Sequence, residues 1–432
     1  MRTSVVVALL CLVCVLGIPF RSYAQRPAMG NHPIEASDWN FECMITNKLC
    51  GVNGEWIHTR SQPGTVRLWY TGTEWALLNK GQGNYDWTSL DTWLDLIAEH
   101  QPRSVIYTFG LTPCWISSTH CDHKGWGNGH NYSPSPPKDL TSSGSPSFNA
   151  FVTALVQHCT PAGNCVKDYI GYWEMWNEAN IPEYWTGTPA QLYDMFAPVI
   201  PIIRNNIPNV KILTPPVCGG EGGWMAKWLT LENTKGRLSD YFSIHLYLRN
   251  YSPEQRISTL QWMLDIKNAN GWTTTPWLNS ETNFVLGTFT CSPLFTRDDC
   301  RGQLVRWHVM QYALQGGAGG AIHVGWFNWM RSIPAGHYDT YYYTMMQWLI
   351  GSTFTASCTT VGTVWTCPLV EASGAQALIV WDAAGPSQYK PAPAYVDYRK
   401  FDGTYGGETI PISAGESVPI KYVPIMLETA VP

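Results

Sequence analysis

The chain has 432 residues and a formal net charge of −5, and only 14% of its residues are charged. This composition lacks the basic footprint of a nucleic-acid-binding protein, so we expect no nucleic acid partner. The length suits one large domain followed by a small second one.

The N-terminus has the features of a secretory leader. An apolar run from Val5 to Phe20 follows a basic start, and small residues around Ala24 supply a cleavage site. This order predicts a signal peptide over residues 1–24. The run is short for a membrane anchor, and no later stretch is long and apolar enough to span a bilayer. We therefore expect a secreted or periplasmic monomer without a membrane anchor.

After a weakly patterned start, short runs of β-branched and aromatic residues alternate with segments of helical spacing. The first strand is assigned to residues 41–45. The other expected strands lie at 65–70, 104–109, 171–176, 210–214, 240–247, 276–281 and 321–324. The main expected helices lie at 90–97, introduced by residues 85–91, and at 147–158, 190–206, 253–268 and 298–314. This alternation predicts an α/β fold, a (β/α)₈ TIM barrel, over residues 25–350.

The pattern changes after residue 350. Expected strands at 363–369, 377–381, 395–401 and 418–425 are separated by Gly, Pro and Ser. They predict a small C-terminal antiparallel β-domain over residues 351–432, packed on the barrel.

Most of the 13 cysteines fall into close pairs. In a secreted protein this spacing predicts disulfides that staple loops. The pairs are Cys43/Cys50, Cys114/Cys121, Cys159/Cys165, Cys291/Cys300 and Cys358/Cys367. Cys11 and Cys14 lie in the expected signal peptide, and the remaining Cys218 is interpreted as a buried thiol.

A superficial metal motif occurs in the segment 117–146. His120, His123 and His130 lie near Cys121, but their spacing fits no established zinc pattern. We interpret the segment as a stapled surface loop and expect neither a metal nor a cofactor.

Two glutamates follow expected strands. Asn177-Glu178 ends the Trp-rich strand, and Ser280-Glu281 ends a later one, with room for about three βα units between them. A carboxylate at the C-terminal end of a barrel strand is a typical catalytic position, although a lone Asn-Glu could also open a helix. Two such carboxylates facing one cleft suit double-displacement glycoside hydrolysis. One protonates the leaving oxygen, and the other attacks the sugar carbon.

Other residues near these strands extend the pattern. Arg67 lies inside a strand, and a buried arginine requires a carboxylate partner, either an active-site glutamate or one elsewhere in the barrel. Glu174 shares strand parity with Glu178 but lies deeper, so we expect a structural role, such as pairing with Arg67. Trp115 follows another strand and is either a sugar platform or a loop-packing residue. The 22 Trp and 22 Tyr suit stacking on sugars, and the β-domain could be a sugar-binding module.

With these motifs the chain resembles the clan A retaining glycoside hydrolases. It is most similar to family 39, the β-xylosidase and α-L-iduronidase family, with family 5 as a more distant neighbour. The resemblance covers roughly residues 64–350. It is carried by Trp176-Asn177-Glu178-Ala179-Asn180, Ser280-Glu281, Arg67, His245-x-Tyr247 and Trp326.

The resemblance implies a role for each of these residues. Glu178 would be the acid/base and Glu281 the nucleophile, while Asn177 would bind the sugar 2-hydroxyl. The supporting roles fall to residues around the nucleophile. Arg67 and Tyr247 would hydrogen-bond Glu281 and keep it ionised, His245 would orient this shell, and Trp326 would form the floor beneath the sugar.

The implied activity is retaining hydrolysis of O-glycosidic bonds in plant or microbial oligo- or polysaccharides. A retaining enzyme needs its two carboxyls about 5–5.5 Å apart. Two alternatives stay open: a non-catalytic carbohydrate-binding barrel, and a transglycosylase that uses the same site.

Overall fold

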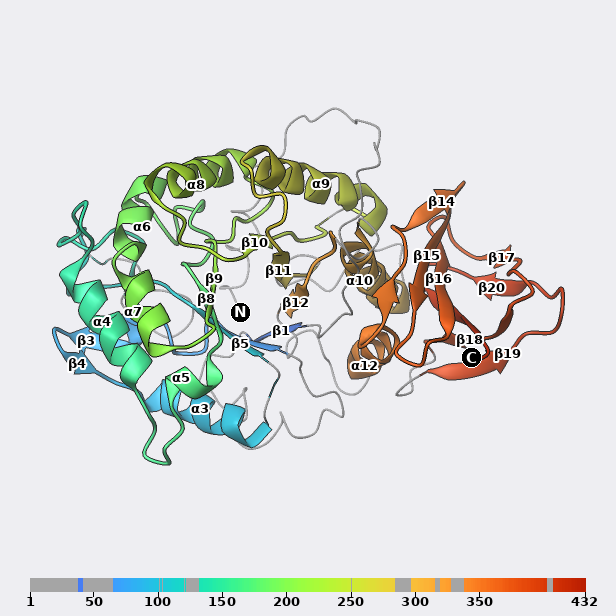
Figure 1. Ribbon diagram of the computed structural model, residues 1–432, viewed down its shortest axis with the longest axis horizontal. Coiled ribbons are helices and arrows are strands. Elements are labelled where there is room, and N and C mark those ends of the chain that lie inside the picture. The colour runs from blue at the N-terminus through green and yellow to red at the C-terminus, as the bar shows by residue number, and fades with distance from the viewer. Residues whose placement is uncertain are drawn as a thin grey trace.

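The computed structural model describes residues 38–41, 65–100, 102, 104–119, 121, 132–249, 251–283, 297–314, 319–327, 338–401 and 407–432. The expected signal peptide lies outside these residues. Helices surround a central group of strands, and a separate set of strands packs at one side (Figure 1). The fold is therefore α/β, as the sequence predicts. Among the described helices, none is long and apolar enough to span a membrane.

The central sheet has eight strands, all paired in parallel, in the order β10-β11-β12-β1-β2-β5-β8-β9. In chain order they are β1 (Asp38–Phe41), β2 (Thr65–Leu68), β5 (Ser104–Thr108), β8 (Tyr172–Glu174), β9 (Lys211–Leu213), β10 (Phe242–His245), β11 (Trp277–Thr282) and β12 (His323–Phe327). The two strands at the ends of this order also meet, because Leu213 of β9 forms a parallel bridge with Tyr241 beside β10. All carboxyl ends therefore lie at one edge of the sheet.

Helices cover the outside of the sheet (Figure 1). They are α2 (Trp75–Leu78), α3 (Thr88–His100), α4 (Pro146–Gln157), α5 (Val166–Tyr169), α6 (Pro189–Phe196), α7 (Val199–Asn206), α8 (Gly222–Lys235), α9 (Pro253–Ala269), α10 (Arg297–Tyr312) and α12 (Tyr338–Leu349). Several begin with strong local signals. Thr188 and Ser252 each form a capping box with a glutamine three residues on, followed by a proline at the helix start.

The structure corrects several expected elements. The first strand is Asp38–Phe41, earlier than expected, and residues 42–45 lie outside the described part. The single helix expected at 190–206 is two helices, since α6 ends at Phe196 and α7 begins after Pro198, whose ring cannot continue a helix. Helices α8 and α12 have no counterpart among the main expected helices. The α8 sequence begins with two glycines, which are poor helix formers, so its helical signal is weak.

The C-terminal strands pair antiparallel. The larger sheet is built from β13 (Thr353–Phe354), β14 (Thr359–Val361), β15 (Val364–Val370), β16 (Gln376–Asp382), β18 (Tyr395–Lys400), β19 (Glu408–Pro411) and β21 (Ile425–Thr429). β17 (Ser387–Tyr389) and β20 (Val418–Ile420) form a separate pair. The strand expected at 418–425 is thus two strands. Trp381 of β16 donates to Glu254 of α9 at 2.8 Å, which ties the larger sheet to the helical layer.

Three of the expected disulfides are present among the described residues: Cys114–Cys121, Cys159–Cys165 and Cys358–Cys367. Cys300 is also disulfide-bonded, while its expected partner Cys291 lies outside the described residues, as do Cys43 and Cys50. Cys218 is a buried thiol, as expected.

Candidate active site

Glu178 lies in a turn beyond β8. The strand ends at Glu174, earlier than the sequence suggests, and the backbone N–H of Trp176 donates back to the Glu174 carbonyl at 2.9 Å. Trp176 and Glu178 have positive φ angles of 78° and 42°. Non-glycine residues rarely adopt this region, and such strain clusters at functional sites. The buried Trp176 ring anchors the turn and so presents the Glu178 side chain at the carboxyl edge of the sheet.

Glu281 lies near the end of β11, where the ladder is irregular. The pairing of β10 with β11 is interrupted, so His245 pairs with Glu281 while Ile244 pairs with Asn279. β12 approaches β11 closely at Gly325, where an added Cβ would lie 2.4 Å from the carbonyl oxygen of Ser280. Only glycine fits there, and the close packing fixes the end of β11.

Arg67 joins three site residues by hydrogen bonds from its guanidinium. Its Nε donates to Glu174 at 2.8 Å, its Nη1 to Glu281 at 2.8 Å, and its Nη2 to both Glu174 and Asn177. Burial alone would lower the pKa of the guanidinium, but the adjacent charges of Glu174 and Glu281 outweigh it and raise that pKa. The sequence left two kinds of carboxylate partner open for Arg67, an active-site glutamate and one deeper in the sheet, and Arg67 contacts both.

Glu174 is fully buried and surrounded by hydroxyl donors. Its Oε2 accepts from Thr108 at 2.9 Å, and its Oε1 accepts from Ser243 at 2.8 Å and Ser280 at 2.6 Å. With Arg67 these donors fully satisfy the carboxylate, which matches the expected structural role. The three hydroxyls could not be identified from the sequence, because single Ser and Thr residues on strands carry no distinctive pattern.

His245 links Glu178 to this hydroxyl group. Its Nδ1 lies 2.8 Å from Glu178 Oε1, and its Nε2 lies 3.1 Å from the Ser280 hydroxyl. Burial and then the charge of Arg67 lower the pKa of the imidazole well below its ordinary value, so His245 is neutral.

Tyr247 lies on the other side of the nucleophile candidate. Its hydroxyl donates a hydrogen bond to Glu281 Oε1. Burial raises the pKa of the Glu281 carboxyl, while the charge of Arg67 and the Tyr247 hydrogen bond oppose that rise. Burial and the neighbouring charge of Glu281 raise the pKa of Tyr247 itself, so the phenol stays protonated as a donor.

One oxygen each from Glu178 and Glu281 and one nitrogen from His245 lie within 4.8 Å of one another. These atom types could in principle hold a divalent cation. The guanidinium of Arg67, bonded to Glu281 at 2.8 Å, already supplies a positive charge at this point and disfavours a second one. The group thus fits two carboxylates facing a shared space better than it fits a metal centre.

The two candidate tryptophans are less informative. Trp115 is partly buried against the core, and its indole N–H donates to the Asn79 carbonyl at 3.3 Å, which favours loop packing over a sugar platform. Trp326 lies on β12 and pairs with Trp39 on one side and Thr282 on the other, at the same edge as Glu281.

No family model matches the chain. Solved structures match it over nearly its whole length. A glucosidase from Croceicoccus marinus is 15% identical with a TM-score of 0.61, covering 94% of this chain and 98% of that one. A monomeric β-xylosidase from Caulobacter crescentus CB15 is 12% identical with a TM-score of 0.61, covering 93% and 97%. The chain shares the fold of these enzymes.

A family 39 glycoside hydrolase from the gut symbiont Bacteroides cellulosilyticus WH2 also matches, with 14% identity and a TM-score of 0.59, over 85% of this chain and 75% of that one. The predicted resemblance to family 39 and its clan therefore extends to the fold. At these identities the similarity concerns the fold alone.

Proposed function

We propose that the protein is a secreted retaining glycoside hydrolase whose eight parallel strands form a closed (β/α)₈ barrel within residues 25–350, followed by a β-domain over 351–432. Glu178 is the acid/base and Glu281 the nucleophile. The bridge between Leu213 and Tyr241 supports closure of the barrel. The disulfides support export, because such bonds persist in oxidising compartments.

One observation carries the proposal: oxygens of Glu178 and Glu281 lie within 4.8 Å at the carboxyl edge of the sheet. Retaining enzymes have carboxyls about 5–5.5 Å apart, whereas inverting enzymes need roughly 6.5–9.5 Å to admit a water. The limit of 4.8 Å between one oxygen of each carboxylate is compatible with the closer carboxyl spacing, and so with direct attack by one carboxylate on the anomeric carbon.

The hydrogen bonds around His245 support a resting proton on Glu178. The Ser280 hydroxyl donates to Glu174, so its oxygen accepts from Nε2–H of His245. A neutral imidazole with its proton on Nε2 has a lone pair on Nδ1, and Glu178 then donates to it at 2.8 Å. This arrangement keeps a proton on Glu178, as a general acid requires, while Arg67 and Tyr247 favour ionised Glu281.

The reaction follows from these two protonation states. Glu281 attacks the anomeric carbon and forms a glycosyl ester, as the bond to the leaving oxygen breaks and Glu178 protonates that oxygen. Ionised Glu178 then takes a proton from water, whose oxygen attacks the same carbon and releases the Glu281 carboxylate. Asn177, fixed by Arg67 through its side-chain oxygen, can donate from its amide nitrogen to the sugar 2-hydroxyl.

Kinetics on paired substrates test the assignment. Glu178→Ala should slow substrates with poor leaving groups by about 10²–10⁴-fold, the usual contribution of general acid catalysis. Aryl glycosides with activated leaving groups need little protonation, so their glycosylation step should lose much less. Equal losses on both substrate kinds would contradict the role of Glu178. Failure of the wild type to cleave xylans, mannans, β-glucans and aryl glycosides would instead favour a non-catalytic sugar-binding barrel.

A further inference from the structure

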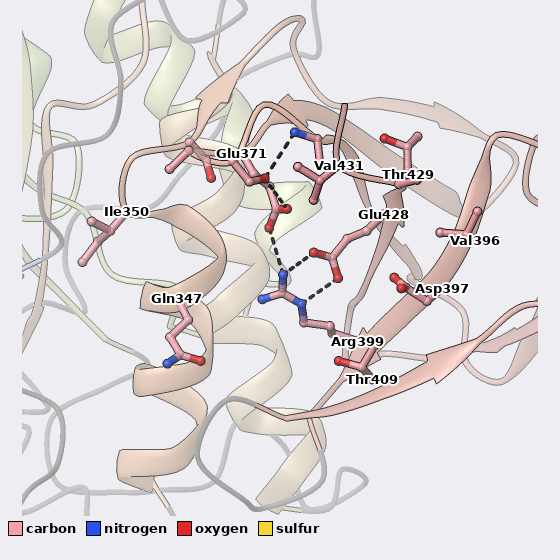
Figure 2. Close-up of a pocket in the computed structure, with 15 residues that line it drawn as sticks. Gln347, Ile350, Glu371, Val396, Asp397, Arg399, Thr409, Glu428, Thr429 and Val431 are labelled. Carbon is pink, nitrogen blue, oxygen red and sulfur yellow. Dashed lines mark hydrogen bonds and ion pairs between the residues drawn. The ribbon is translucent and has the colours of Figure 1, made fainter.

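A cavity of about 500 Å³ lies in the C-terminal region, between the end of α12 and the larger antiparallel sheet. Its lining comes from α12, the turn between β15 and β16, strands β18, β19 and β21, and the last residues of the chain (Figure 2). Ligand pockets typically have volumes of about 300–1,000 Å³. The cavity is separate from the carboxyl edge that carries Glu178 and Glu281.

Arg399 forms the polar centre of this cavity. Its Nε donates to Glu428 at 2.6 Å, and its Nη2 donates to Glu428 and, at 3.2 Å, to Glu371 (Figure 2). The two carboxylates hold the guanidinium plane in one orientation. Among the described residues Nη1 has no acceptor, and it extends toward the side of the cavity where Gln347 lies. The cavity thus contains a fixed donor.

Asp397 supplies an acceptor in the same cavity. Its Oδ1 is buried, yet it has no hydrogen-bond partner among the described residues. The register of β18 against β21 is interrupted between Tyr395 and Asp397, which explains how the consecutive residues Val396 and Asp397 both line the cavity. A buried acceptor without a donor costs free energy unless a ligand or water satisfies it.

The rim is apolar and exposed. Ile350, Val396 and Val431 are 43%, 43% and 65% exposed. They are three of only six large hydrophobic residues that are exposed in the described part of the chain. Their gathering around one cavity indicates a binding surface, because single exposed apolar residues are otherwise scattered.

We propose that this cavity is a second saccharide-binding site, which holds a neutral mono- or disaccharide unit of a glycan. A sugar hydroxyl both donates and accepts, so hydroxyls at separate positions of the glycan unit can satisfy Arg399 Nη1 on one side of the Arg399–Glu428 ion pair and Asp397 on the other. The C–H face of the ring would pack on the aliphatic rim. A cation would leave the arginine donor unsatisfied, and an anion would be repelled by Asp397, Glu371 and Glu428.

The cavity lining contains no aromatic residue, so the site recognises hydroxyl positions instead of the flat face of a long chain. The choice of a saccharide over other neutral polyols rests on the proposed function, because a hydrolase benefits from a site that keeps a polymeric substrate nearby. Binding at the cavity does not require catalysis, so the two proposals can fail separately.

Affinity electrophoresis through gels containing arabinoxylan, galactomannan or barley β-glucan tests the site, with Glu281→Gln as the background so that the polymer is not cleaved. We expect at least one polymer to retard the protein. Adding Asp397→Ala should weaken the apparent affinity by roughly 3- to 10-fold, the effect of losing one or two net hydrogen bonds. Val431→Asn, at the exposed rim, should weaken it as well without disturbing the core.

Glu416→Ala is the matched control, because Glu416 is an exposed carboxylate of the same region outside the cavity. It should migrate like the background protein. Equal retardation of all four proteins, no retardation by any polymer, or retardation that EDTA abolishes would each overturn the proposal.

In the otherwise wild-type chain, Asp397→Ala should hydrolyse small aryl glycosides at the wild-type rate. A wild type that binds polymer but cleaves nothing would refute the hydrolase and leave the binding site standing.

Discussion

The proposed proton on Glu178 depends on Ser280, and Ser280→Ala tests that dependence. Ser280 and Ser243 both donate to Glu174 Oε1 from buried positions, at 2.6 and 2.8 Å, but Ser280 also contacts His245 Nε2 at 3.1 Å. Without the Ser280 oxygen, Nε2–H of His245 loses its acceptor. The imidazole proton can then move to Nδ1, where it donates to ionised Glu178 and disfavours the acid form.

The size of the effect follows from the lost hydrogen bond. A neutral hydrogen bond contributes about 0.5–1.5 kcal/mol, and 1.36 kcal/mol corresponds to one pH unit. The general acid loses its proton at the basic limb of the pH profile of kcat/KM. This limb should therefore shift to lower pH by roughly 0.4–1 unit. At pH values above the shifted limb, substrates with poor leaving groups should react more slowly, while activated aryl glycosides should respond less.

Ser243→Ala is the matched control, since it removes the other hydroxyl donor to the same Glu174 oxygen. Both variants should lower the free energy of unfolding by about 1–3 kcal/mol, because each leaves a buried carboxylate with one donor fewer. Only Ser280→Ala should move the basic limb. A limb that moves equally in both variants, or in neither, would refute the assigned hydrogen-bond directions around His245.

Three further results are expected. Glu281→Gln should abolish turnover with the fold intact, and NMR of the wild-type reaction should show a first-formed sugar with the substrate's anomeric configuration; the opposite anomer would exclude double displacement. Burial raises the pKa of the Glu74 carboxyl to about 7, so the folded state holds a proton that the unfolded state loses first. The free energy of unfolding should therefore fall as pH rises from about 4.5 to 7. Urea titrations at pH 5 and pH 8 measure this fall, and it should be smaller by roughly 2–3 kcal/mol in Glu74→Gln, whose side chain does not titrate. Peptide mapping without reduction should recover all five close cysteine pairs, and a bridge to Cys218 would contradict the pairing.

The sequence was most informative where a residue conflicts with its surroundings. Arg67 stands out as a charge within an apolar strand, and that conflict alone predicts a carboxylate partner. The structure adds that one guanidinium contacts both Glu174 and Glu281. Glu178 could be identified by its place after a Trp-rich strand, although that strand ends four residues earlier, at Glu174.

Other parts of the site could not be predicted, for identifiable physical reasons. Thr108, Ser243 and Ser280 act by converging on Glu174 from three strands, and their convergence depends on register. The interrupted pairing that places Glu281 beside His245 is a tertiary feature without a local signal. The cavity around Arg399 is formed by segments from α12 to the C-terminus, so no single stretch of sequence reveals it.

The contact between Arg67 and Glu281 joins residues 214 positions apart in the chain. Contacts between residues so far apart form late in folding, because the entropic cost of closing the loop is offset only after many non-local strand pairings have formed. A partly folded intermediate with β2 in place but β11 unpaired would lack Glu281, the proposed nucleophile, and leave Arg67 with an incomplete set of partners. Recovery of hydrolytic activity should therefore lag behind recovery of helical circular dichroism during refolding, which makes catalysis a reporter of the final pairing step.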